Sequence, residues 1–245
     1  VGKSYIAEEF AKNNYKSYIL IDFNMVSDDV KNLFNNYLDR LDYFFEFISN
    51  YYGVKLYERD TLFIFDEVQL FPRARSAIKY LVADGRYDYI ETGSLISIKE
   101  NTKDILIPSE ERSIALNPLD FEEFLWAMGE ESLYNLIKKI YDDHIQVPEL
   151  IHRKAMDLFK KYMIIGGMPQ AIMKYIETND FEETDKIKRN ILKLYREDID
   201  KHAGYYKMKV RSIFDEIPAQ LQKHEKKFQI TSLSKDAKSR DYEDA

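Results

Sequence analysis

The fold is decided by the stretch LFIFDE, residues 62–67. Four consecutive apolar residues between polar neighbours are typical of a strand that is buried on both faces, as in a parallel sheet with helices on each side. Asp66 and Glu67 follow at once, so both carboxylates are expected at the carboxyl end of that strand. Open α/β sheets bind their ligands at this edge. The stretch therefore predicts an α/β fold with a candidate site at the end of one strand.

Three further runs predict strands around this one. They cover residues 18–23 (YILIDF), 87–91 (YDYIE) and 112–116 (RSIAL). Apolar residues at helical spacing lie between them, over a long helix at 30–48 and a shorter one at 74–83. Strands that alternate with helices predict a parallel sheet that is covered on both faces.

From Asp120 onward the sequence reads as helical almost throughout. Asp120 and Glu123 form the pattern of a capping box at the start of the first of these helices. We therefore expect three parts: an α/β core over residues 1–118, a helical lid-like region over 119–205, and the start of a truncated C-terminal domain over 206–245.

The composition limits the classes of function. The net charge is −7, from 36 basic and 43 acidic residues, which argues against a protein that coats nucleic acid by bulk charge. The chain has no cysteine, and none of its four histidines is spaced for metal binding to another. No apolar run approaches the length of a membrane span, and no signal peptide is visible. We expect a cytoplasmic protein without a membrane partner, truncated at its N-terminus because it begins with Val1.

A second motif opens the first predicted helix, where Gly2, Lys3 and Ser4 follow one another. This order ends the phosphate-binding loop G-x-x-x-x-G-K-[ST], of which the last four positions are present. In such a loop the backbone N–H groups face the phosphates, the lysine reaches the terminal phosphates, and the hydroxyl binds Mg²⁺. Taken alone, the tripeptide is common and occurs mostly in exposed turns.

Together the two motifs are far more specific, because they stand in the required order with a predicted strand between them. We predict an ATP site whose nucleotide-binding residues are Gly2, Lys3, Ser4 and Tyr5. Ser4 and Asp66 are the predicted Mg²⁺ ligands, and Glu67 is the predicted group that polarises the attacking water.

Other polar residues are weaker candidates. Thr92 ends the third strand, where its hydroxyl could contact the γ-phosphate or the water, or could simply belong to a turn. Arg112 is a further catalytic candidate that could meet a phosphate, although a solvated surface charge is the simpler role. Gln69 could orient water or contact a partner, although a turn before a helix is the simpler interpretation. Three arginines could serve as a finger in a neighbouring subunit, although a solvated surface charge is the simpler role for each: Arg73, Arg75 and Arg86.

Four stretches carry a resemblance to a known family. These are GKSYIAEEFAKNN (2–14), LFIFDEVQLFPRARSAIKYLVADGRYDYIETGS (62–94), ERSIALNPLDFEEFL (111–125) and YMIIGGMPQAI (162–172). Together they resemble a prokaryotic family of predicted AAA-like P-loop ATPases, similar to archaeal and signal-transduction P-loop ATPases, with a C-terminal domain of unknown function. The sequence from Ile217 resembles the opening of that second domain.

The resemblance implies a sheet of order 5-1-4-3-2. Its central strand, just before the phosphate loop, would lie between the strand that ends at Thr92 and the one that starts at Arg112, and this sequence lacks it. The resemblance also implies that Thr92 is a polar sensor, with Ser94 as a second candidate. Because the first glycine of the loop is missing too, ATP binding by this fragment stays an open question.

Two functions remain open from the sequence. The first is an ATPase whose turnover drives a conformational or regulatory change, in the helical region or in a homo-oligomer. The second is a nucleotide-dependent binding module that contacts DNA through a C-terminal domain. The resemblance implies that this domain is winged-helix-like, and a basic cluster that includes Lys223, Lys227 and Lys238 is a separate motivation. A third reading is a helical interaction domain joined to an inactive ATPase, which the intact motif residues argue against.

Overall fold

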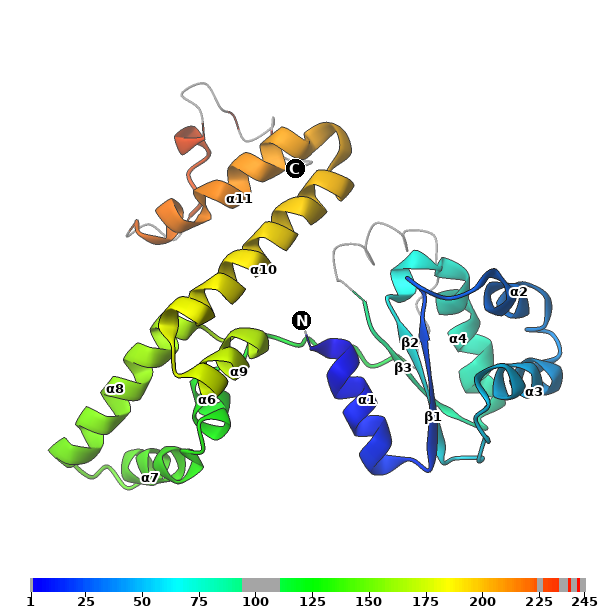
Figure 1. Cartoon of the computed structure of the whole chain (residues 1–245), viewed down its shortest axis with the longest axis horizontal. Coiled ribbons are helices and arrows are strands. Elements are labelled where there is room, and N and C mark those ends of the chain that lie inside the picture. The colour runs from blue at the N-terminus through cyan, green and yellow to red at the C-terminus, as the bar shows by residue number, and fades with distance from the viewer. Residues whose placement is uncertain (1, 94–110, 224–226, 234–237, 239–241, 243–245) are drawn as a thin grey trace. The chain divides into compact units, whose positions relative to one another are not determined.

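The computed structural model describes residues 2–93, 111–223, 227–233, 238 and 242. The chain forms two compact units, Val1–Asn117 and Pro118–Ala245, and each has its own core (Figure 1). The sequence between the third and fourth predicted strands, over residues 97–111, lies outside the described residues apart from Glu111.

The first unit contains a parallel sheet of three strands in the order β1-β2-β3. The strands are β1 (Ser17–Asp22), β2 (Thr61–Asp66) and β3 (Asp88–Glu91). The central strand β2 is buried along its whole length, as its apolar sequence predicts. The α/β class and the parallel sheet are therefore confirmed.

Alternate residues of β2 serve the two faces of the sheet. Leu62 and Ile64 pack against Ala7 and Ala11 of helix α1 (Lys3–Asn14). On the opposite face, the phenylalanines of β2 enter a larger aromatic core. Three helices contribute to that core: α2 (Asp28–Asn36), α3 (Leu41–Tyr52) and α4 (Pro72–Asp84). Figure 1 shows α1 on one side of the sheet and α2 to α4 on the other.

The prediction of one long helix over residues 30–48 is wrong, because the chain forms α2 and α3 with a turn between them. A straight helix of that length would extend about 28 Å, whereas a strand of six residues extends about 20 Å. The turn allows both Phe34 and Phe44 to be buried in the same core, with their ring centroids 5.0 Å apart.

The prediction of a strand over residues 112–116 is also wrong, since the described residues 111–120 form no regular secondary structure. Ile114 is 79% exposed and Leu116 is also exposed, so the apolar residues of this run are not buried. A strand needs the backbone of a neighbour to satisfy its N–H and C=O groups. In the described part of the chain no strand pairs with the outer edge of β3.

The second unit is helical. Its helices are α6 (Phe121–Ala127), α7 (Glu131–Asp142), α8 (Glu149–Ile165), α9 (Pro169–Thr178), α10 (Phe181–His202) and α11 (Lys207–Leu221). The capping box is confirmed, because the side chains of Asp120 and Glu123 each accept a hydrogen bond from the other's backbone N–H group. Phe124 and Ile172 lie in a core shared by α6, α8 and α9.

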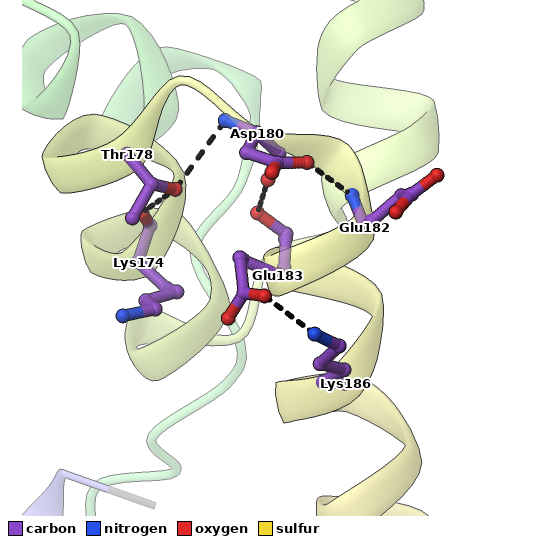
Figure 2. A network of polar contacts seen from close by, with 7 residues as sticks. Lys174, Thr178, Asp180, Glu182, Glu183 and Lys186 are labelled. Atoms are coloured by element: carbon purple, nitrogen blue, oxygen red, sulfur yellow. Dashed lines mark hydrogen bonds and ion pairs between the residues drawn. The ribbon is translucent and has the colours of Figure 1, made fainter.

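Side chains also fix the corner between α9 and α10 (Figure 2). Asn179 takes a left-handed conformation with φ 50°, which ends α9. Asp180 then caps α10, accepting a 2.7 Å hydrogen bond from the backbone N–H of Glu182, while the hydroxyl of Thr184 donates to the backbone carbonyl of Asp180. These bonds satisfy groups that a helix end leaves without intrahelical partners.

Candidate functional site

The predicted residues Asp66 and Thr92 meet at the carboxyl edge of the sheet. The parallel register pairs Phe65 of β2 with Glu91 of β3, so the next residues of both strands are neighbours. The hydroxyl of Thr92 donates a hydrogen bond to Oδ1 of Asp66, and both side chains are buried. The backbone of Thr92 is held as well, because its N–H donates a hydrogen bond of 2.8 Å to the carbonyl of Phe65.

Glu67 leaves the strand in an unusual conformation. Its φ of 52° and ψ of 44° lie in the left-handed region, which non-glycine residues seldom adopt. Its backbone N–H donates to Oδ1 of Asp66 at 3.2 Å. Its carboxylate accepts a 2.5 Å hydrogen bond from the side-chain amide of Gln69. Such outliers gather at functional sites, where surrounding contacts hold them.

Gly2, Lys3 and Ser4 lie at the same edge of the sheet. Only Tyr15 and Lys16 separate the end of α1 from the start of β1, so the helix runs back along the sheet, antiparallel to its strands. A helix of twelve residues is about as long as a strand of six, roughly 18 and 20 Å. The start of α1 therefore lies near the carboxyl ends of the strands, as Figure 1 shows.

The start of α1 is suited to an anion. Gly2 precedes it with φ 88°, a conformation open to glycine, and no side chain caps the first turn. The first N–H groups of the helix are thus available to a ligand, and the positive end of the helix dipole favours phosphate. Lys3 and Ser4 are partly buried there, while the side chain of Tyr5 is 68% exposed.

The donors present suit magnesium. Mg²⁺ prefers oxygen ligands, and it binds through one or two carboxylates while keeping water and substrate phosphate as further ligands. The described residues hold no cluster of three or more acidic, histidine or cysteine side chains that could bind a metal by themselves. Among the described residues, both hydrogen bonds to the carboxylate of Asp66 are accepted by Oδ1, so Oδ2 is the oxygen left for a metal. Asp66 and the hydroxyl of Ser4 are therefore a fitting partial set.

Arg112 lies in the irregular segment 111–120, and its side chain is exposed. Ser94 lies outside the described residues.

The prediction of a solvated surface charge is wrong for Arg75. Its side chain is only 4% exposed and bridges two carboxylates, Glu91 at 2.7 Å and Glu111 at 2.8 Å. Burial raises the pKa of Glu91 to about 7, an effect that Arg75 opposes and Glu111 reinforces. This triad was not predicted from the sequence, although Glu91, an acidic residue at the end of an apolar strand, was a usable signal.

The other two arginines differ from Arg75. Arg86 forms ion pairs of 2.7 Å with Asp84 and Asp42, and its guanidinium lies over the ring of Phe45. Arg73 is exposed on α4.

Comparison with known families agrees with this architecture. A family model described as an AAA domain matches residues 1–125, which is half of the chain. The chain belongs to the AAA-domain family. A second model, described as a domain of unknown function (DUF8612), matches residues 156–245. No curated protein and no solved structure was found to match the chain.

The AAA-domain match confirms the expected family and with it a P-loop type of nucleotide-binding fold. The second match confirms a C-terminal domain of unknown function in this AAA protein, but it begins at residue 156, well before Ile217. It therefore includes much of the helical region expected to be lid-like. Within the described residues, no helix combines the length and the apolar character needed to cross a membrane.

Proposed function

We propose that this protein binds ATP and hydrolyses it in a Mg²⁺-dependent reaction at the carboxyl edge of the sheet. The observation that carries the proposal is the arrangement of Asp66, Glu67 and Thr92 at the strand ends, on the edge where the uncapped start of α1 lies. Membership of the AAA-domain family supports the same chemistry.

Each residue has a distinct role in the proposal. The N–H groups at the start of α1 and the ammonium group of Lys3 bind the phosphates. Ser4 and Asp66 would hold Mg²⁺, which would neutralise part of the phosphate charge. Glu67 accepts a proton from the attacking water, and Thr92 orients the carboxylate of Asp66.

A charge from a neighbouring copy completes many ATPase sites of this kind. Arg75 and Arg86 are engaged in ion pairs of 2.7–2.8 Å within their own unit. The exposed Arg73 is therefore the best candidate of the three for a finger in a homo-oligomer. Turnover would then drive a conformational or regulatory change, as expected from the sequence. Arg112 stays a candidate phosphate contact.

Two substitutions test the proposal, in a protein that carries the complete phosphate loop. Lys3→Ala is expected to weaken ATP binding at least about 100-fold, the effect of several charge-assisted hydrogen bonds. Glu67→Gln is expected to retain binding while the hydrolysis rate falls by about 100-fold or more. Calorimetric titration measures the affinity, and phosphate release measures the rate.

The matched control for Lys3→Ala is Lys12→Ala. Lys12 lies in the last turn of the same helix, exposed and paired with Glu8 and Glu9. Its loss should leave ATP affinity unchanged. Unaltered affinity in Lys3→Ala would overturn the nucleotide site, and an equally fast Glu67→Gln would remove Glu67 from the mechanism.

The alternative function is nucleotide-dependent binding of DNA without useful turnover. It predicts that Glu67→Gln, which retains ATP, binds duplex DNA with strong salt dependence. No binding at low salt would remove this alternative.

A further inference from the structure

Gln69 contacts the proposed water-activating carboxylate directly. Its amide Nε2 donates a hydrogen bond of 2.5 Å to Oε2 of Glu67. Gln69 is only 7% exposed, an unusual position for a glutamine. A surface glutamine in a simple turn would have no reason to be buried against a carboxylate.

The segment that carries Gln69 is firmly attached to the sheet. Gln69 is the middle residue of the short 3₁₀ helix η1 (Val68–Leu70). The backbone N–H of Val68 donates to the carbonyl of Thr92 at 3.1 Å, and its side chain is fully buried in the aromatic core. The N–H of Leu70 donates to the carbonyl of Glu67 at 3.0 Å. The amide of Gln69 is therefore presented from a rigid support.

A glutamate at a strand end needs such a support. Its side chain has three rotatable bonds, and fixing them costs conformational entropy. A hydrogen bond to an ionised group offsets that cost more effectively than one between neutral groups. Gln69 binds Oε2 of Glu67, and the described residues give Oε1 no hydrogen bond. Oε1 is thus the oxygen that would receive a proton from water.

We propose that Gln69 is a positioning residue that orients the carboxylate of Glu67 for ATP hydrolysis. The inference rests on the proposed function, because it assigns Gln69 a part in the same reaction. Gln69 itself touches neither phosphate nor water in this scheme. Its effect passes entirely through Glu67, and that dependence is what distinguishes the proposal from a role in folding.

The first test replaces the amide and keeps the volume. Gln69→Met removes the donor from a buried position with little change in packing, and Gln69→Asn shortens the side chain so that the amide no longer reaches Glu67. Measured in a protein that carries a complete phosphate loop, each is expected to lower kcat about tenfold, the effect of one lost charge-assisted hydrogen bond. KM and the affinity for a non-hydrolysable ATP analogue should stay within about twofold of the unsubstituted protein, since ground-state binding is untouched.

The decisive test is a double-mutant cycle. If Gln69 acts through Glu67, adding Gln69→Met to Glu67→Gln should not lower the residual single-turnover rate any further. A similar tenfold loss in both backgrounds would overturn the proposal, because Gln69 would then act independently of Glu67. A Gln69→Met variant with unchanged or raised kcat would overturn it as well. If Gln69→Met fails to fold, the same cycle with Gln69→Asn decides the question.

The outcome for the proposed function is separate. An unsubstituted protein that neither binds nor hydrolyses ATP would overturn the proposed function. A protein that hydrolyses ATP at a rate indifferent to Gln69 would leave that function intact and overturn only this inference.

Discussion

At the residue scale, the main electrostatic feature next to the site is the triad that the buried Arg75 forms with Glu91 and Glu111. Arg75 comes from α4, Glu91 is the last residue of β3, and Glu111 belongs to the segment that precedes α6. Glu91 immediately precedes Thr92, whose hydroxyl contacts Asp66. The triad therefore holds the end of β3 at the position where Thr92 emerges.

The raised pKa of Glu91 predicts a pH-dependent stability. The pKa rises from 4.5 to about 7 on folding, so between these values the folded protein binds more protons than the unfolded one. Glu91 therefore contributes stability that is fully present below about pH 4.5 and is lost as the pH rises through about 7. Between pH 5 and pH 8, the Glu91→Gln variant should lose about 1–3 kcal/mol less unfolding free energy than the unsubstituted protein.

Urea unfolding across this pH range measures the effect. The exposed Glu46→Gln on α3 is the control, and it should follow the unsubstituted protein. Identical slopes for Glu91→Gln and the unsubstituted protein would show that Glu91 does not titrate in this range.

The sequence was a good guide to some residues and a poor guide to others. Asp66 and Thr92 could be foreseen as neighbours, because parallel strands end at one edge and each residue directly follows an apolar run. The burial of Arg75 could not, because it depends on how α4 packs beside β3 and on Glu111, 36 residues further along the chain. The spacing of apolar residues alone does not show which charged side chain forms a buried ion pair.

At the element scale, the contact between Gly167 and the segment before α6 fixes the corner between α8 and α9. The backbone N–H of Leu119 donates to the carbonyl of Gly167 at 2.7 Å. A Cβ atom at Gly167 would lie 2.1 Å from the carbonyl oxygen of Leu119, well inside any real contact. Backbone would have to move to admit it, and the hydrogen bond would be lost.

Gly167→Ala is therefore expected to destabilise the protein by about 3 kcal/mol or more, through overpacking and a lost hydrogen bond. Gly129→Ala is the matched control. Gly129 has φ 74° but open space around the position of a Cβ, so only the backbone cost of about 1 kcal/mol applies. Denaturant unfolding compares the two. Equal losses of unfolding free energy in the two variants would show that the backbone at Leu119 can move away from Gly167 at little cost.

Elements themselves were foreseen where the apolar pattern is long or strictly buried. The strand β2 lies close to its expected range, and helices α8 to α10 lie in the region expected to be helical. The break between α2 and α3 was missed because the apolar spacing continues through it, and only the length of the sheet requires the turn. The run at 112–116 was misread as a strand because sequence shows apolar residues but not whether a backbone partner exists.

At the scale of the whole molecule, the two units have separate cores, and the single tryptophan reports on one of them. Trp126 lies on α6, whose buried Phe124 packs with Ile165 and Ile172 of the second unit. The AAA-domain match nevertheless extends to residue 125, inside the same helix. Fluorescence of Trp126 therefore shows with which unit α6 unfolds.

The proposed ATP site belongs wholly to the first unit, so ATP should stabilise that unit selectively. A ligand present at about 100 times its Kd adds about 2.7 kcal/mol of stability, which corresponds to a rise of about 10 °C or more in the unfolding temperature of a domain of this size. Mg²⁺-ATP should shift one calorimetric transition by this amount, while the transition reported by Trp126 moves by less than about 2 °C. Lys3→Ala should abolish the shift. If the Trp126 transition instead rises together with the first, α6 and the core around it unfold as one cooperative unit with the ATP site, and the helical unit responds directly to nucleotide.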